Sequence, residues 1–88
     1  MTQHAMGLPN RPADEVASRI LDVLIAGGGR YEDEPGAVLA GIAEATDCNY
    51  FGVAVAVRML EEIGFVQVSR KDEPGARRGN RIDGVYLV

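Results

Sequence analysis

The sequence has too few reactive residues to build several common kinds of site. It contains one cysteine, Cys48, and one histidine, His4, among 88 residues. A single cysteine cannot close an intramolecular disulfide, and these two residues are too few for a zinc cluster. Neither an acid–base pair nor a nucleophile with a neighbouring base can be assembled. We therefore expect no metal, no cofactor and no enzyme activity.

Long apolar runs are also missing. The first eleven residues lack the apolar stretch of a signal peptide, and no later run approaches the roughly 18 apolar residues of a membrane span. Cys48 most simply stays reduced, as a small apolar residue. The sequence therefore predicts a cytoplasmic protein that neither crosses a membrane nor is exported.

Basic residues are in deficit overall but concentrated locally. Nine basic and thirteen acidic residues leave a net charge of −4, which argues against a general nucleic-acid binder. Between residues 70 and 81, however, five basic residues oppose two acidic ones (+3), whereas the remainder has four basic and eleven acidic residues (−7). The five are Arg70, Lys71, Arg77, Arg78 and Arg81. This segment is suited to phosphate contact, or else it is a solvated loop whose charge deters edge pairing.

The first half of the chain predicts a flexible arm followed by two helices. Residues 1–12 form the arm, and residues 13–88 form one domain. A first helix is expected over 13–26, ended by three consecutive glycines. A second helix is expected from Pro35 to about Ala45, with the acidic residues before Pro35 at its amino end. Thr46 and Asp47 then form a tight turn.

The second half predicts a third helix and a β-hairpin. Asn49 is placed either to cap this helix or to contact a base. Residues 53, 57, 60 and 64 share one helical face, which we expect to point to the core, and Gly64 is suited to end the helix. Strands are expected over 65–70 and 82–88, paired antiparallel. The fold class is thus α+β, with three helices followed by a hairpin.

This order of elements, together with two local motifs, resembles a winged helix-turn-helix domain of bacterial transcription regulators. Residues 40–46, AGIAEAT, resemble the second helix of that family, and residues 57–66, VRMLEEIGFV, resemble its LxxLEExGLV passage into the hairpin, or wing. The likeness covers residues 13–88. The resemblance implies a small DNA-binding regulator whose partners are double-stranded DNA and a second copy of the chain.

The resemblance also implies which residues contact DNA. The amino-terminal half of the third helix would enter the DNA, and the basic wing would contact the backbone or the minor groove. The residues assigned to DNA are Asn49, Tyr50, Arg58, Arg70, Lys71, Arg77, Arg78 and Arg81.

An alternative function follows from the apolar residues of the same helix. Phe51, Ala54 and Val55 stand where readers of base edges commonly carry polar side chains. If Phe51 and Val55 are exposed, this face is suited to a partner protein or a second copy. If instead Tyr50 and Phe51 pack against the first helix or the arm, no such surface exists.

Overall fold

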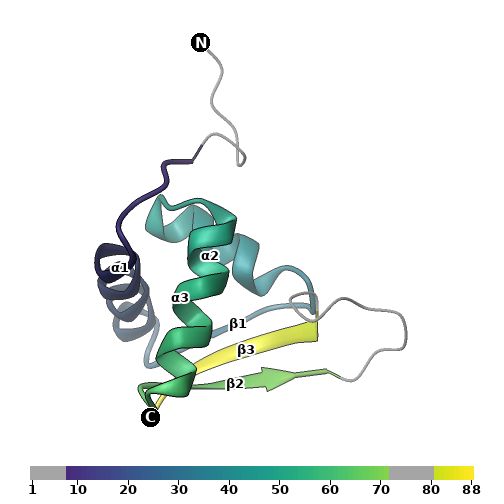
Figure 1. The fold of residues 1–88 in the computed structure, drawn as a ribbon. Helices are drawn as coiled ribbons and strands as arrows, with labels where there is room; N and C mark the ends of the chain where they lie inside the picture. The colour runs from purple at the N-terminus through teal and green to yellow at the C-terminus, as the bar shows by residue number, and fades with distance from the viewer. Residues whose placement is uncertain (1–7, 72–80) are drawn as a thin grey trace.

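The computed structural model describes residues 8–71 and 81–88. The elements follow in the order α1 (Ala13–Ala26), β1 (Arg30–Glu32), α2 (Val38–Thr46), α3 (Tyr50–Glu62), β2 (Val66–Arg70) and β3 (Ile82–Leu87). The helices pack together beside a small antiparallel sheet (Figure 1). The predicted α+β class, with three helices and a hairpin formed by β2 and β3, is confirmed. The strand β1 was not predicted.

The sheet has the strand order β1-β3-β2, so β3 is its central strand. Tyr31 of β1 lies opposite Val85 of β3, and Val68 of β2 lies opposite the same residue on the other side. Tyr86 of β3 adds a side-chain link to β1, because its hydroxyl donates to Glu32 Oε2 at 2.6 Å. β1 thus closes the side of the sheet that a two-stranded hairpin would leave open.

The predicted start of the second helix at Pro35 was wrong. Residues 34–37 form a turn, and α2 begins at Val38. Gly36 has a φ of 89°, which an α-helix cannot contain. The acidic residues assigned to the amino end of this helix instead end β1 and enter the turn.

α1 follows the prediction at both ends. Its buried side chains include Val16, Ile20 and Leu24, which recur at helical spacing. Asp14 and Glu15 lie in the first turn, where carboxylates favour the positive end of the helix dipole. Behind the last turn, the Gly29 N–H donates to the Leu24 carbonyl at 2.7 Å, so the glycines end the helix as expected.

The connection between α2 and α3 is a tight turn with local hydrogen bonds. Asp47 has a φ of 57°, the left-handed conformation predicted for this turn. Asn49 Oδ1 accepts a hydrogen bond from the Gly52 N–H at 2.7 Å and so caps α3. Cys48 between them is fully buried, consistent with a small apolar residue.

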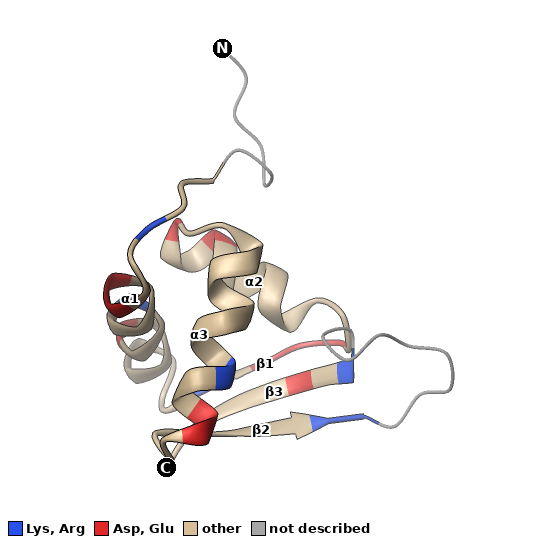
Figure 2. Cartoon of the chain, in the orientation of Figure 1, with Lys and Arg blue, Asp and Glu red and all other residues tan. Residues whose placement is uncertain are grey.

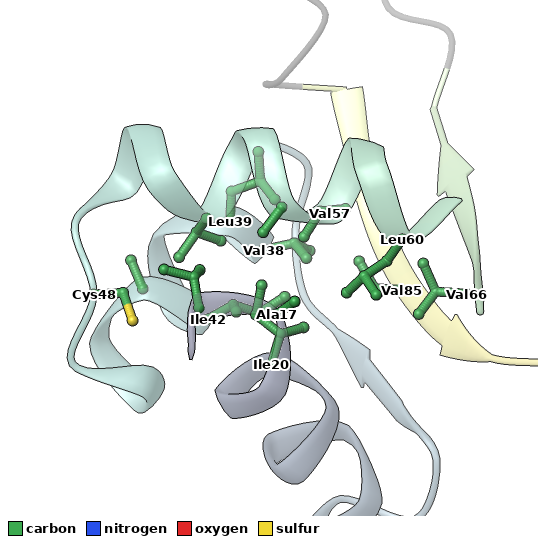
Figure 3. Packing of buried hydrophobic residues seen from close by; sticks show 14 of the residues in the cluster. Ala17, Ile20, Val38, Leu39, Ile42, Cys48, Val57, Leu60, Val66 and Val85 are labelled. Atoms are coloured by element: carbon green, nitrogen blue, oxygen red, sulfur yellow. The ribbon is translucent and has the colours of Figure 1, made fainter. Parts of the chain in front are cut away.

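The core lies between the three helices and the inner side of the sheet (Figure 3). α1 contributes Ile20, α2 contributes Ile42, and α3 contributes Leu60, all buried. Val66 and Val85 cover the sheet side of this cluster. The predicted inner face of α3 is confirmed at residues 53, 57 and 60.

Gly64 does not belong to that inner face, as had been predicted, because the chain has left the helix before reaching it. It is exposed and has a φ of 86°, so its predicted role in ending α3 is confirmed.

Part of the segment predicted as an arm contacts the domain. Leu8 packs on the core, and the Pro9 carbonyl accepts from the Asn49 N–H at 2.9 Å. Arg11 donates through Nε to the Asp47 carbonyl at 2.8 Å and forms an ion pair with the Asp47 carboxylate at 2.6 Å. These contacts hold residues 8–11 against the turn between α2 and α3. Residues 1–7 of the predicted arm lie outside the described residues.

Within residues 8–71 and 81–88, no helix combines the length and apolar character that a membrane crossing requires.

Candidate nucleic-acid interface

The amino-terminal half of α3 presents an open surface. Phe51 is 77% exposed, Val55 is 49% exposed and Tyr50 is 41% exposed. Arg58 is also exposed, one turn further along. Of the two alternatives left open by the sequence, the structure shows the exposed one for Phe51 and Val55. Any partner of this helix would meet an aromatic ring and an aliphatic side chain before reaching Arg58.

Asn49 stands at the end of this surface with one of its polar atoms already engaged. Its side-chain oxygen caps α3, which leaves the amide NH₂ group as the donor for an external contact. Of the two roles considered for Asn49, the structure shows the helix cap.

A groove of about 480 Å³ separates α3 from the hairpin. α3 contributes Arg58 and two carboxylates, Glu61 and Glu62, while the strands contribute Arg70 and Ile82. The Lys and Arg positions of α3 and those at the adjoining ends of β2 and β3 lie along this side of the molecule (Figure 2). The groove is therefore lined by charges of both signs, with the cationic groups at its two walls.

Arg70 is paired with Glu61 across the wall of this groove. Its two terminal nitrogens donate to the two carboxylate oxygens at 2.9 and 3.0 Å, a bidentate geometry. These hydrogen bonds lower the pKa of Glu61 and raise the pKa of Arg70, since each favours the charged form of its partner. The charge of Arg70, which the sequence assigned to phosphate contact, is thus compensated within the protein.

The ends of β2 and β3 bring two further cationic residues together. The Lys71 N–H donates to the Arg81 carbonyl at 2.6 Å, so these residues stand side by side at this end of the sheet. Lys71 is exposed and Arg81 is half-buried. Arg77 and Arg78, the other two predicted wing contacts, lie outside the described residues.

Carboxylates are distributed unevenly around these groups. Several lie on α1 and near the end of α2, away from the ends of β2 and β3, whereas others lie on β1, on β3 and on the last turn of α3 (Figure 2). Asp83 is the second residue of β3, close to Arg81 in sequence. The cationic residues on this side are Arg58 on α3 and, across the groove, Lys71 and Arg81 at the ends of the strands; we call these three residues the cationic strip.

Sequence reasoning identified the residues of the cationic strip but missed Glu61. Glu61 and Arg70 are nine residues apart and meet only because β2 turns back along α3 after Gly64. Sequence periodicity shows which residues share a face of α3 or of β2, but it does not show how the helix and the strand are oriented relative to each other. The sequence therefore held no direct signal for the Glu61–Arg70 pair.

Comparison with known proteins gives no further guide to this surface, since no protein-family model, curated protein or solved structure matches the chain.

Proposed function

We propose that this chain is a winged helix-turn-helix protein that binds double-stranded DNA and regulates transcription. In this proposal α3 enters the major groove and the β2–β3 hairpin is the wing. The observation that carries the proposal is the position of the cationic strip, which borders the exposed half of α3 and continues to the ends of both wing strands. A helix and a hairpin with cationic groups on one side match the groove and the backbone of a duplex.

The dimensions and side chains of α3 support this placement. Its 13 residues give a helix of about 20 Å, and a major groove about 12 Å wide admits an α-helix. Ala54 and Gly52 are small enough to allow close approach to the bases. The polar groups available for base edges are few, namely those of Asn49, Tyr50 and Arg58. Phosphate contacts therefore dominate the proposed affinity, and sequence discrimination is modest.

Fluorescence anisotropy with a labelled duplex, measured across a series of salt concentrations, tests this proposal. We expect binding that weakens steeply as salt increases, because phosphate contacts release counterions. The double variant Arg58→Gln with Lys71→Gln removes two charges of the cationic strip and should weaken binding about tenfold or more while lowering the salt slope by about two.

The matched control is Arg30→Gln on β1. Arg30 is exposed, and its Nε lies 3.7 Å from Glu32 Oε1. Its replacement removes one positive charge on a strand outside the groove and should change affinity much less. A folded wild-type chain that binds no duplex even at low salt contradicts the proposal, as does an equal loss in the control and the double variant.

The exposure of Phe51 favours a second candidate function, in which α3 binds a protein rather than DNA. An aromatic side chain that is 77% exposed on a helix surface is typical of an interface residue. The neutral variant Phe51→Ser with Val55→Ser separates the two functions, because it removes apolar area without adding a charge that repels phosphate. Loss of self-association with retained DNA binding assigns the face to protein contact. Loss of DNA binding alone assigns it to the duplex.

A further inference from the structure

The strand β2 forms an open edge of the sheet. In the strand order β1-β3-β2 the outer side of β2 has no neighbouring strand among the described residues. The other edge, β1, is protected, because it is only three residues long and two of them, Arg30 and Glu32, are exposed and charged. β2 has five residues, and its first four, 66–69, carry no charge. Proteins usually protect an exposed edge strand against pairing, often with charged side chains. β2 has no charged side chain before Arg70.

The hydrogen-bond pattern shows which backbone groups face outward. The Val88 N–H donates to the Phe65 carbonyl at 3.1 Å, so these residues form a hydrogen-bonded pair of the antiparallel ladder. Such pairs alternate along antiparallel strands, so Gln67 directs its N–H and C=O toward β3. Val66 and Val68 therefore direct theirs toward the open edge.

An exposed apolar patch continues from this edge. Ile25, Ile63, Phe65 and Val88 are each between 54% and 80% exposed, and we call them the basal patch. A shallow hollow of about 310 Å³ is lined by three of them together with Leu21, Gly64 and Leu87. A second hollow, along β2, shares Gly64 and Val88 with the first, so patch and edge are contiguous. The patch lies at the foot of α3, near the chain end marked C, whereas Phe51 lies in the first turn of that helix (Figure 1).

We propose that two copies of the chain associate through this region, with β2 pairing antiparallel to β2 of the second copy about a two-fold axis near Val68. A two-fold axis brings identical surfaces together, so the surface must be complementary to itself. Here Val68 faces Val68, and Arg70 faces the uncharged Val66, so no like charges are opposed. A single six-stranded sheet results, and the basal patches of the two copies lie beside the new strand pair.

The available area agrees with a second copy as the occupant. At these exposed fractions the four side chains of the basal patch present roughly 400 Å², about half of the ~800 Å² that each copy buries in a stable interface. The five-residue edge and the two adjoining hollows supply contact area for the remainder. The exposed half of α3 and Arg58 are not part of the paired strands, whereas Lys71 lies at the end of the new strand pair, opposite Phe65 of the second copy. The proposal rests on the strand edge and the basal patch, so it does not depend on DNA binding.

Sedimentation equilibrium over a range of protein concentrations tests the proposal. The expected mass for the wild type rises from 9.4 kDa to twice that value as the concentration increases. Val68→Pro removes the outward N–H, a change that an edge strand tolerates, and should leave the chain monomeric. Val68→Ala is the matched control, since it loses similar side-chain contacts but keeps the N–H, and it should still dimerise. Circular dichroism shows whether both variants are folded.

A second variant keeps the test decisive if Val68→Pro fails to fold. Ile63→Ser with Phe65→Ser changes only exposed side chains of the basal patch and should weaken dimerisation at least tenfold. A wild-type chain that remains monomeric at all concentrations overturns the proposal. Dimerisation that is unchanged in the basal-patch variant also overturns it, because the copies would then associate through another face such as that of Phe51.

Discussion

At the scale of single residues, the pairing of Arg70 with Glu61 decides how much positive charge the groove offers to a phosphate. A phosphate that contacts Arg70 must compete with a carboxylate already bound through two hydrogen bonds. Glu61 also adds a negative charge of its own to the groove wall. The same glutamate therefore stabilises the junction between α3 and β2 and opposes the proposed binding.

Replacing Glu61 by glutamine should increase DNA affinity. Glu61→Gln keeps the shape of the side chain but removes its charge, so Arg70 becomes available to phosphate. We expect affinity to rise about threefold to tenfold and the salt slope to steepen by about one charge, measured by anisotropy at several salt concentrations.

Glu62→Gln serves as a control, because Glu62 also lines the groove, whereas Glu61 is the carboxylate that forms the ion pair with Arg70. Glu62→Gln should raise DNA affinity less than Glu61→Gln, because it removes only the repulsion between the Glu62 carboxylate and the phosphates. If Glu61→Gln instead lowers affinity, Glu61 holds Arg70 in the orientation that binds DNA.

The same pair should give the stability of the fold a defined pH dependence. The pKa of Glu61 is lower in the folded state, so its contribution is present at neutral pH and is lost as the pH falls through that lowered pKa. Because Arg70 is 39% exposed, the contribution should be small, about 0.5 kcal/mol. Urea unfolding of the wild type and Glu61→Gln at neutral and acidic pH measures it. A difference that stays constant or grows on acidification contradicts this assignment.

At the scale of elements, the sequence predicted what depends on local patterns and missed what depends on contacts between distant segments. α1 and α3 have apolar residues at helical spacing and recognisable end signals, so their positions and inner faces were predicted closely. β1 has only the residues Arg30, Tyr31 and Glu32, too few to show alternation. It is a strand because β3 offers it a hydrogen-bonding edge, and that edge is formed more than fifty residues later.

The contact between β1 and α2 explains why Gly41 of α2 has no side chain. Tyr31 is half-buried and lies directly over Gly41 of α2, in the space that a Cβ atom at Gly41 would occupy. The absence of a side chain there lets the hydroxyl end of the tyrosine ring approach the helix.

Gly41→Val should displace Tyr31 and loosen β1. Overpacking of this kind costs about 1–3 kcal/mol, and amide hydrogen exchange should quicken at Arg30–Glu32 more than in β2. Ala40→Val is the control, because Ala40 is the exposed neighbour on the same helix and receives the same side chain. Helix propensity alone favours Gly41→Val and disfavours Ala40→Val, so it cannot explain a greater loss at Gly41. Equal stability loss in both variants, with no local change in exchange, would show that Tyr31 does not depend on Gly41.

At the scale of the whole molecule, a net charge of −4 is compatible with DNA binding only if the basic residues are concentrated on one side. The cationic strip faces one side, and residues 70–81 carry five of the nine basic residues of the chain. The remaining surface is acidic and would be repelled by a duplex, which favours a single orientation on DNA. Pairing through β2 would add a second binding site and raise the effective concentration of each. Such a protein should bind as a dimer more tightly than either domain alone.

The central claim, that the α3 and hairpin side of the molecule binds DNA, is tested most directly by NMR titration of the labelled chain with a short duplex. The proposed orientation predicts chemical-shift changes concentrated at residues 49–58, Lys71 and Arg81, with little change along α1. Saturation of these shifts should require more duplex as salt is increased. Absence of any shift at low salt, or shifts centred on α1 and the basal patch while residues 49–58 stay unchanged, would contradict it.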